Sequence, residues 1–214
     1  MRDVEASDLV SLKLLLASRW LPSSLLKNEL DRVSAQTTEA LCSLLDEKAP
    51  AELEEVSRRI KPLSGSIEER RAAMATNHST LVEALSKVIG YDRAVDAGRE
   101  SLFRVGVRLG EESRIRLGVG ESIGDLLLAA RVLYRVLGIS FDAHWSGDGL
   151  QVVVDRCALS GHYSELACIV MSAVDEGAVR GLNPLISMRF ERRITSGFPT
   201  CVARVNVQAG GSKG

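Results

Sequence analysis

Apolar residues recur every three to four positions through the first part of the chain, which is typical of amphipathic helices. This pattern covers residues 8–47, beginning at Leu9. Proline is favoured in the first turn of a helix. Pro22 and Pro50 therefore predict the starts of a second helix and of a third helix over residues 51–61.

The same spacing continues in the middle of the chain. It predicts a short helix that ends near Gly90, a long helix over residues 92–117, and another helix from Ser122 to Gly138. Glycines lie on one stripe of the long helix, at Gly98, Gly106 and Gly110. Such small residues let another backbone come close, either for packing or to form a groove for a ligand, and the sequence leaves both alternatives open.

The apolar period changes to two near residue 141, which is typical of strands with one buried face. Residues 141–145 and 150–154 predict a hairpin, and residues 162–177 predict a helix after it. A second hairpin is predicted from residues 185–194 and 200–207. In its first strand apolar side chains alternate with polar ones, as in an antiparallel sheet with one solvated face.

This order of elements predicts an α+β fold, in which N-terminal helices precede a helix-covered, mostly antiparallel sheet of about four strands. We divide the chain into a helical extension over residues 1–75, an α+β domain over residues 76–207, and a disordered tail over residues 208–214. The first boundary is suggested by Met74, which would make a natural start for the second segment.

Composition narrows the classes of function. The formal net charge is −1, so no strong positive field is present to bind nucleic acid. No apolar run is long enough to predict a transmembrane helix, and the acidic N-terminus with its interrupted apolar stretch makes a poor signal peptide. We expect a cytoplasmic protein without nucleic-acid or membrane partners.

The cysteines fit this expectation. Cys42, Cys157, Cys168 and Cys201 form no Cys-x-x-Cys pair, and in a cytoplasmic protein they are expected to be free thiols. Cys157 follows a predicted strand and precedes a predicted helix, where the helix dipole would favour a thiolate. It is a candidate nucleophile, or else a small buried residue at the end of a strand.

The predicted helix over residues 162–177 carries a second group of reactive side chains. Glu165, Cys168, Ser172 and Asp175 share the face opposite to its apolar residues. This face could line a pocket or lie in solvent. If this face lines a pocket, Asp175 or Glu165 is a candidate for activating water.

Two kinds of binding residue remain. Cys157, His162, Cys168 and Cys201 are soft ligands that suit zinc, although their spacing matches no recognised zinc pattern, and the cofactor is left open. Several arginines could bind a carboxylate substrate or lie on a solvent-exposed surface. They are Arg156 and, on the last strands, Arg189, Arg192 and Arg193. Of these we select Arg192 and Arg156, together with His144 at a pocket mouth, as substrate-binding candidates.

Several short motifs resemble one known family. They are Val154-Asp155-Arg156-Cys157, Glu165-Leu166, Gly181-Leu182-Asn183-Pro184, Arg192, Gly197 and Cys201. Over about residues 79–207 the chain resembles the L-2-amino-thiazoline-4-carboxylic acid hydrolase family, whose fold is similar to that of 4-vinyl reductase domains. The family pattern has Cys-x-x-Asp where this helix has Ser172-x-x-Asp175, and paired cysteines where the last strand has Cys201 alone.

The resemblance implies one of two functions. The first is hydrolysis of a small cyclic C–N or C–S substrate that bears a carboxylate, with catalytic Cys157, Asp175 and Glu165, and with Asn183 among the substrate-binding residues. The second is a non-catalytic module that senses a small molecule or a metal, whose N-terminal helices contact a partner. Both imply a small-molecule ligand, and a homodimer is compatible with either.

Overall fold

The computed structural model describes residues 12–146 and 149–207. Within these ranges no helix is both long enough and apolar enough to span a membrane. The helices are α1 (Leu12–Arg19), α2 (Ser23–Lys48), α3 (Pro50–Ser57), α4 (Ile67–Ile89), α5 (Tyr91–Leu117), α6 (Ile123–Leu137) and α7 (Glu165–Leu182). The predicted disordered tail over residues 208–214 lies outside the described residues.

The described residues form one four-stranded sheet, which begins after the sixth helix. Its strands are β1 (Ile139–Ser146), β2 (Gly149–Cys157), β3 (Ile186–Arg192) and β4 (Cys201–Val207). They lie in the order β1-β2-β4-β3, and every neighbouring pair is antiparallel. The predicted α+β class is therefore confirmed, including the N-terminal helices and the antiparallel sheet.

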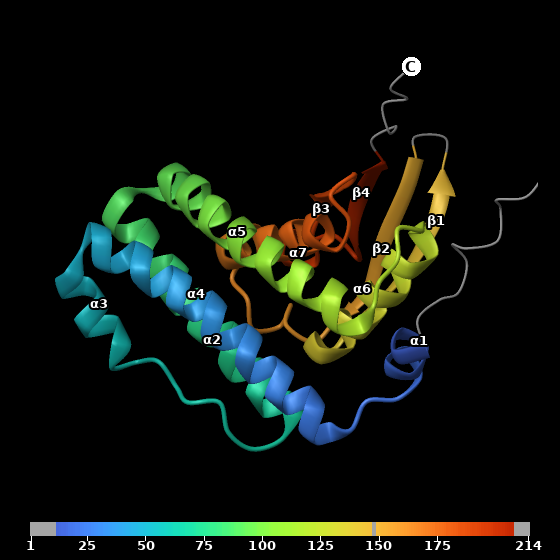
Figure 1. Cartoon of the computed structure of the whole chain (residues 1–214). Helices are drawn as coiled ribbons and strands as arrows, with labels where there is room; N and C mark the ends of the chain where they lie inside the picture. Colours follow the sequence, from blue (N-terminus) through green and yellow to red (C-terminus); the bar gives the residue numbers. More distant parts are fainter. Residues whose placement is uncertain (1–11, 147–148, 208–214) are drawn as a thin grey trace, which may run out of the picture.

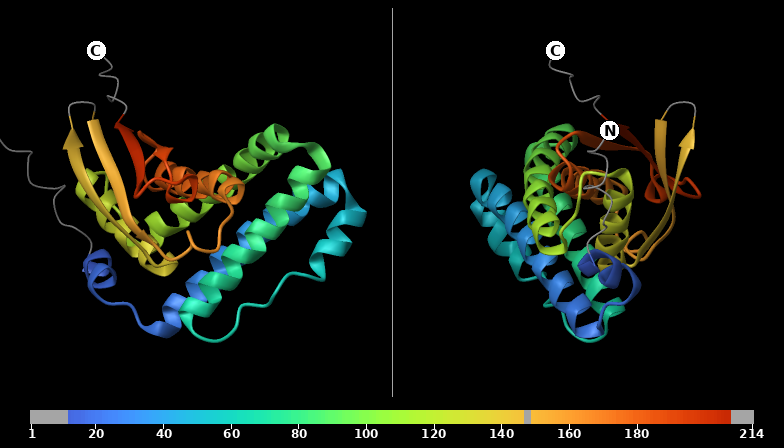
Figure 2. Two further views of the ribbon diagram at one scale, coloured as in Figure 1. Left: turned by 180° about the vertical axis from the view of Figure 1, so that it is seen from behind. Right: turned by 45° about the vertical axis from the view of Figure 1, so that its right-hand side comes forward.

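The molecule has three layers. Helices α6 and α7 cover one face of the sheet, where their apolar residues share a core with the inward side chains of all four strands. Helices α4 and α5 pack on α7 in a second core, and α2 packs on α4 and α5. Figure 1 shows α5 and α7 between the sheet and the pair of helices α2 and α4, and Figure 2 shows that α3 projects away from the sheet.

Helices α5 and α7 touch through their backbones. A Cβ atom added at Gly106 would lie 2.2 Å from the carbonyl oxygen of Val174, and one at Gly110 would lie 2.3 Å from that of Ala178. On the facing helix, Gly177 and Gly181 approach α5 equally closely. Of the two alternatives for the glycine stripe, the structure therefore supports close packing of helices.

Helix α4 is longer than the sequence pattern predicted. It begins after Ser66, whose hydroxyl accepts a hydrogen bond from the Glu69 amide (3.1 Å), while the Glu69 carboxylate accepts one from the Ser66 amide (2.7 Å). This capping box starts the helix, which then continues to Ile89. The predicted division between residues 75 and 76 falls inside it.

Candidate functional site

The inner face of the sheet and the helices that cover it enclose a cavity with two adjacent lobes. Each lobe has a cavity volume of about 80 Å³, several times the roughly 10–15 Å³ that one buried water needs. Five lining residues belong to both lobes: Val33, Tyr134, Leu137, Val174 and Asp175. The lobes are thus adjacent and share part of their walls.

Lobe one is lined almost entirely by apolar side chains. They come from α6, α7 and the sheet, among them Leu126, Leu127, Ala130, Leu133, Val152, Met188 and Val205. The few polar residues of this wall, among them Glu29, Arg32 and Asp175, contribute little of its surface. The wall suits an apolar ligand or an apolar part of one.

Lobe two carries the polar and sulfur-containing side chains. Its wall includes Cys157, Cys168, Cys201, Ser172, Asp175 and Arg193, besides the buried His78 and the half-buried Tyr163. Four of the predicted functional residues, namely the three cysteines and Asp175, are therefore brought to one cavity. Of the α7 face predicted to line a pocket, Cys168, Ser172 and Asp175 do so, whereas Glu165 is exposed.

A β-bulge turns Cys157 toward lobe two. Ser140 pairs with Arg156 and Phe141 with Val154, which leaves Asp155 as an extra residue in β2. One extra residue reverses the alternation of side chains beyond it. Arg156 is consequently exposed, and Cys157 lines the cavity.

A second bulge has the same effect at the end of β3. Phe190 pairs with Ala203 and Arg192 with Val202, so Glu191 is the extra residue. Arg192 is exposed and lies over the ring of Phe198, with its guanidinium carbon 5.8 Å from the ring centre. Its neighbour Arg193, outside β3, lines lobe two instead.

Arg193 is held at the cavity wall by few partners. Its Nη2 donates to the Ser172 hydroxyl (3.0 Å), and its guanidinium carbon lies 5.7 Å from the centre of the Phe190 ring. Its Nε is buried and has no hydrogen-bond partner among the described residues. Burial lowers the pKa of Arg193 from its ordinary value.

The nearby carboxylate of Glu176 is already engaged. One of its oxygens pairs with Arg99 Nη2 (2.6 Å), and the other accepts a bond from the Phe190 amide (3.3 Å). Arg99 also donates to the Ile169 carbonyl and to the Ser172 hydroxyl. Arg99 and Glu176 therefore form a closed pair that links α5, α7 and β3.

Asp175 lies where the two lobes meet. Its carboxyl group makes no hydrogen bond or ion pair with any described residue, although it is half-buried and lines both lobes. Burial, with a smaller contribution from the charge of Glu176, raises its pKa to about 7. Near neutral pH this carboxyl is divided between its protonated and ionised forms.

The three cavity thiols are poor sources of thiolate. Burial raises the pKa of Cys157 to about 11, and it also raises the pKa values of Cys168 and Cys201. The Cys201 sulfur accepts a hydrogen bond from the Ile194 amide at 3.3 Å. Since the thiolate is the nucleophilic form, these surroundings do not activate Cys157.

A chain of polar contacts beside lobe two is not predicted by the sequence pattern. His78 Nε2 is 2.9 Å from the Thr37 hydroxyl, and its Nδ1 is 3.1 Å from the Tyr163 hydroxyl. Burial lowers the pKa of His78 to about 3, so the imidazole is neutral. The contacts join α2, α4 and the segment before α7, whose separation in sequence left no pattern to detect.

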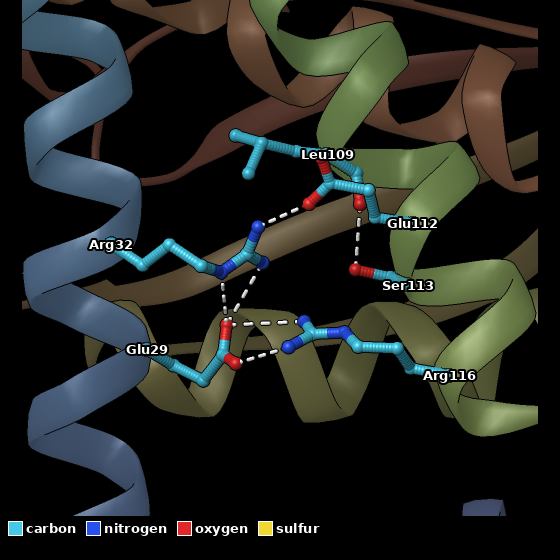
Figure 3. Close-up of polar contacts among 6 residues, drawn as sticks. All are labelled: Glu29, Arg32, Leu109, Glu112, Ser113 and Arg116. Atoms are coloured by element: carbon cyan, nitrogen blue, oxygen red, sulfur yellow. Dashed lines mark hydrogen bonds and ion pairs between the residues drawn. The ribbon is translucent and has the colours of Figure 1, made fainter.

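Ion pairs lie at the edge of lobe one, between α2 and α5 (Figure 3). Glu29 accepts bonds from Arg32 and Arg116, and Arg32 also pairs with Glu112. Burial would raise the pKa of Glu29, but the hydrogen bonds from Arg116 and Arg32 outweigh it and hold the pKa below its ordinary value. Glu29 and Arg32 themselves line the lobe.

Several predicted site residues lie elsewhere. His144, Glu165 and Arg192 are exposed, and Arg156 lines a separate shallow depression on the surface. Asn183 is buried, where its amide donates to the Glu121 carbonyl (3.1 Å) and its oxygen accepts from the Leu185 amide (2.9 Å). Its observed contacts hold the connection after α7.

The predicted metal ligands do not converge. His162 is exposed, whereas Cys157, Cys168 and Cys201 face lobe two. Within residues 12–146 and 149–207 no three His, Cys, Asp or Glu side chains are grouped closely enough to hold a metal ion. The four residues predicted to bind zinc therefore do not form one site. The reason is that His162 lies in the turn before α7, outside the cavity that the three cysteines line.

Comparison with known proteins supports the fold. No protein-family model and no curated protein sequence matches the chain. Among solved structures it is similar to a trafficking protein particle complex subunit 3 from Naegleria fowleri, described as covalently bound to palmitic acid. The match has a TM-score of 0.52 and 18% sequence identity, and covers 65% of this chain and 95% of that one. At this identity the likeness concerns the fold alone.

Proposed function

We propose that the protein is a non-catalytic binding module whose cavity holds a small molecule with an apolar chain. The observation that carries this proposal is the apolar wall of lobe one, which adjoins the more polar wall of lobe two. A narrow space of this kind fits a chain better than a bulky ring system. The raised pKa values of the thiols favour binding over thiol-based catalysis.

The structural neighbour suggests a suitable probe. That protein is described as covalently bound to palmitic acid, so long alkyl chains are the first class of molecule to test here. Each buried methylene contributes about 0.8 kcal/mol. In a series of decanol, dodecanol and hexadecanol, affinity should rise with chain length until the cavity is full.

A substitution that fills lobe one tests the proposal directly. Ala130 lines the lobe, so Ala130→Phe should weaken binding of hexadecanol about tenfold or more, measured by displacement of a fluorescent fatty-chain probe. Ala51→Phe on α3 is the matched control, because Ala51 is exposed and lies outside the cavity. Equal affinities in the folded wild type and Ala130→Phe proteins would refute the proposal.

A hydrolase of a small cyclic carboxylate is a second candidate. It is favoured by Asp175, whose pKa of about 7 suits a general base, and which shares lobe two with Cys157. Purified protein should then open the ring of 2-amino-thiazoline-4-carboxylate, and Asp175→Asn should abolish that turnover. Absence of turnover by the wild type would remove this candidate.

We also propose a cytoplasmic location. The four cysteines are free, and free thiols suit a reducing compartment. Fractionation of the source cells, with detection of the native protein, tests this. Assembly as a homodimer stays a prediction, which sedimentation of the purified chain would check.

A further inference from the structure

We propose that the ligand of this cavity carries a carboxylate group, and that Arg193 binds this group at the polar end of lobe two. The inference rests on the proposed binding function and adds the chemical class of the ligand's head group. The observation behind it is that the Arg193 guanidinium borders the cavity, with no carboxylate of the described residues within ion-pair distance.

The contrast between two arginines carries the argument. Arg99 and Arg193 both donate to the hydroxyl of Ser172. Arg99 is neutralised by Glu176 at 2.6 Å, whereas no carboxylate of the described residues lies within 4.0 Å of Arg193. A half-buried cation without a counter-ion is costly, and a bound anion would remove that cost.

The donors of Arg193 are also available. A guanidinium has five N–H donors in a planar fork, and the structure assigns one hydrogen bond to this one, from Nη2 to Ser172. Its Nε is buried without a partner. A carboxylate can bind two such donors at once, one with each of its oxygens, and it also carries the opposite charge.

Other neighbours do not replace an anion. The ring of Phe190 lies beneath the guanidinium and orients it, but an aromatic ring does not neutralise a full charge. Asp175 is not within ion-pair distance of Arg193 and lies at the junction of the lobes. The head group thus lies at Arg193, and the chain runs past Asp175 into lobe one.

Paired probes that differ only in the head group test the inference. Wild-type protein should bind palmitic acid about ten- to a hundredfold more tightly than hexadecanol, as expected for hydrogen bonds to a charged group. Arg193→Gln should abolish this preference by weakening the binding of palmitic acid. Arg192→Gln removes the same charge from the adjacent residue, which is exposed, and should preserve the preference.

The outcomes separate the two proposals. If the wild type binds neither probe, the proposed function itself fails. If it binds both with equal affinity, the function stands and the carboxylate inference is overturned. This wild-type comparison decides the matter even if Arg193→Gln does not fold, and Arg193→Lys, which keeps the charge but loses the fork, should retain part of the preference.

Discussion

Arg192 and Arg193 are adjacent in the chain, yet their guanidinium groups lie in different surroundings. Arg192 is exposed over the ring of Phe198, whereas Arg193 reaches the Ser172 hydroxyl of α7 at the cavity wall. Adjacent residues of a strand point to opposite faces, and the bulge at Glu191 decides that Arg193, and not Arg192, faces the cavity. A single extra residue in one strand therefore selects which arginine lines lobe two.

The backbone contact between α5 and α7 predicts a sharp stability effect. In Gly106→Ala the new methyl group would overlap the Val174 carbonyl, and overpacking of this kind costs about 1–3 kcal/mol or more. Gly161→Ala is the matched control, because no atom lies within 4 Å of a Cβ at that position. Urea unfolding of both variants should show a loss for Gly106→Ala only, and equal losses would contradict the packing described.

Asp175 should make the protein less stable as the pH rises. Its folded-state pKa of about 7 lies above the ordinary value of 3.8. Its contribution is therefore complete below about pH 4 and is lost as the pH rises through 7. Asp175→Asn removes this dependence, so its stability relative to wild type should increase between pH 4 and 7, by up to roughly 4 kcal/mol.

The measurement is urea unfolding of wild type and Asp175→Asn at several pH values in this range. Asp142→Asn, at an exposed position of β1, is the control and should follow the wild-type curve. A constant difference between Asp175→Asn and wild type across the range would show that Asp175 has no raised pKa.

His78 should make the protein less stable as the pH falls. Its folded-state pKa of about 3 lies below the ordinary 6.5, so its contribution is complete above pH 6.5 and is lost as the pH falls toward 3. His78→Leu should cost about 1–3 kcal/mol at pH 7, because Thr37 and Tyr163 lose a buried partner. This cost should shrink on acidification, and a cost that grows instead would contradict a neutral imidazole.

Occupancy of the cavity should protect specific thiols. Cys157 and Cys168 line lobe two, whereas Cys42 is a half-buried residue of α2 that lines neither lobe. Saturating palmitic acid should slow alkylation of the two cavity thiols and leave the rate at Cys42 unchanged, as followed by mass spectrometry of peptides. Unchanged rates at all three positions would place the ligand elsewhere.

The sequence was sufficient for the fold class because apolar periods report directly on secondary structure. The alternation of Ile186 and Met188 with polar residues correctly predicted which face of β3 is buried. Arg156 and Arg192 were nevertheless predicted to bind substrate. The side chains that reach the cavity are instead those of the next residues in the chain, Cys157 and Arg193. Both differences come from bulges, which depend on pairing between strands and leave no periodic signal along one strand.

Contacts between distant segments were equally hidden. His78 contacts residues that are 41 and 85 positions away in sequence, and these side chains meet only because α2, α4 and the segment before α7 pack together. The continuous helix α4 was missed for a different reason. Its first turns are strongly charged, and the apolar stripe that identifies a helix is correspondingly weak there.

The glycine contacts between α5 and α7 also determine how the cavity can change its size. Where two backbones touch, no side chain can rotate to let the helices separate, so this wall behaves as a rigid one. Across lobe one, α2 is joined to α5 through the long side chains of Arg32 and Arg116, which can change conformation at small cost. Lobe one is thus bordered by two kinds of helix contact, backbone against backbone between α5 and α7 and long charged side chains between α2 and α5.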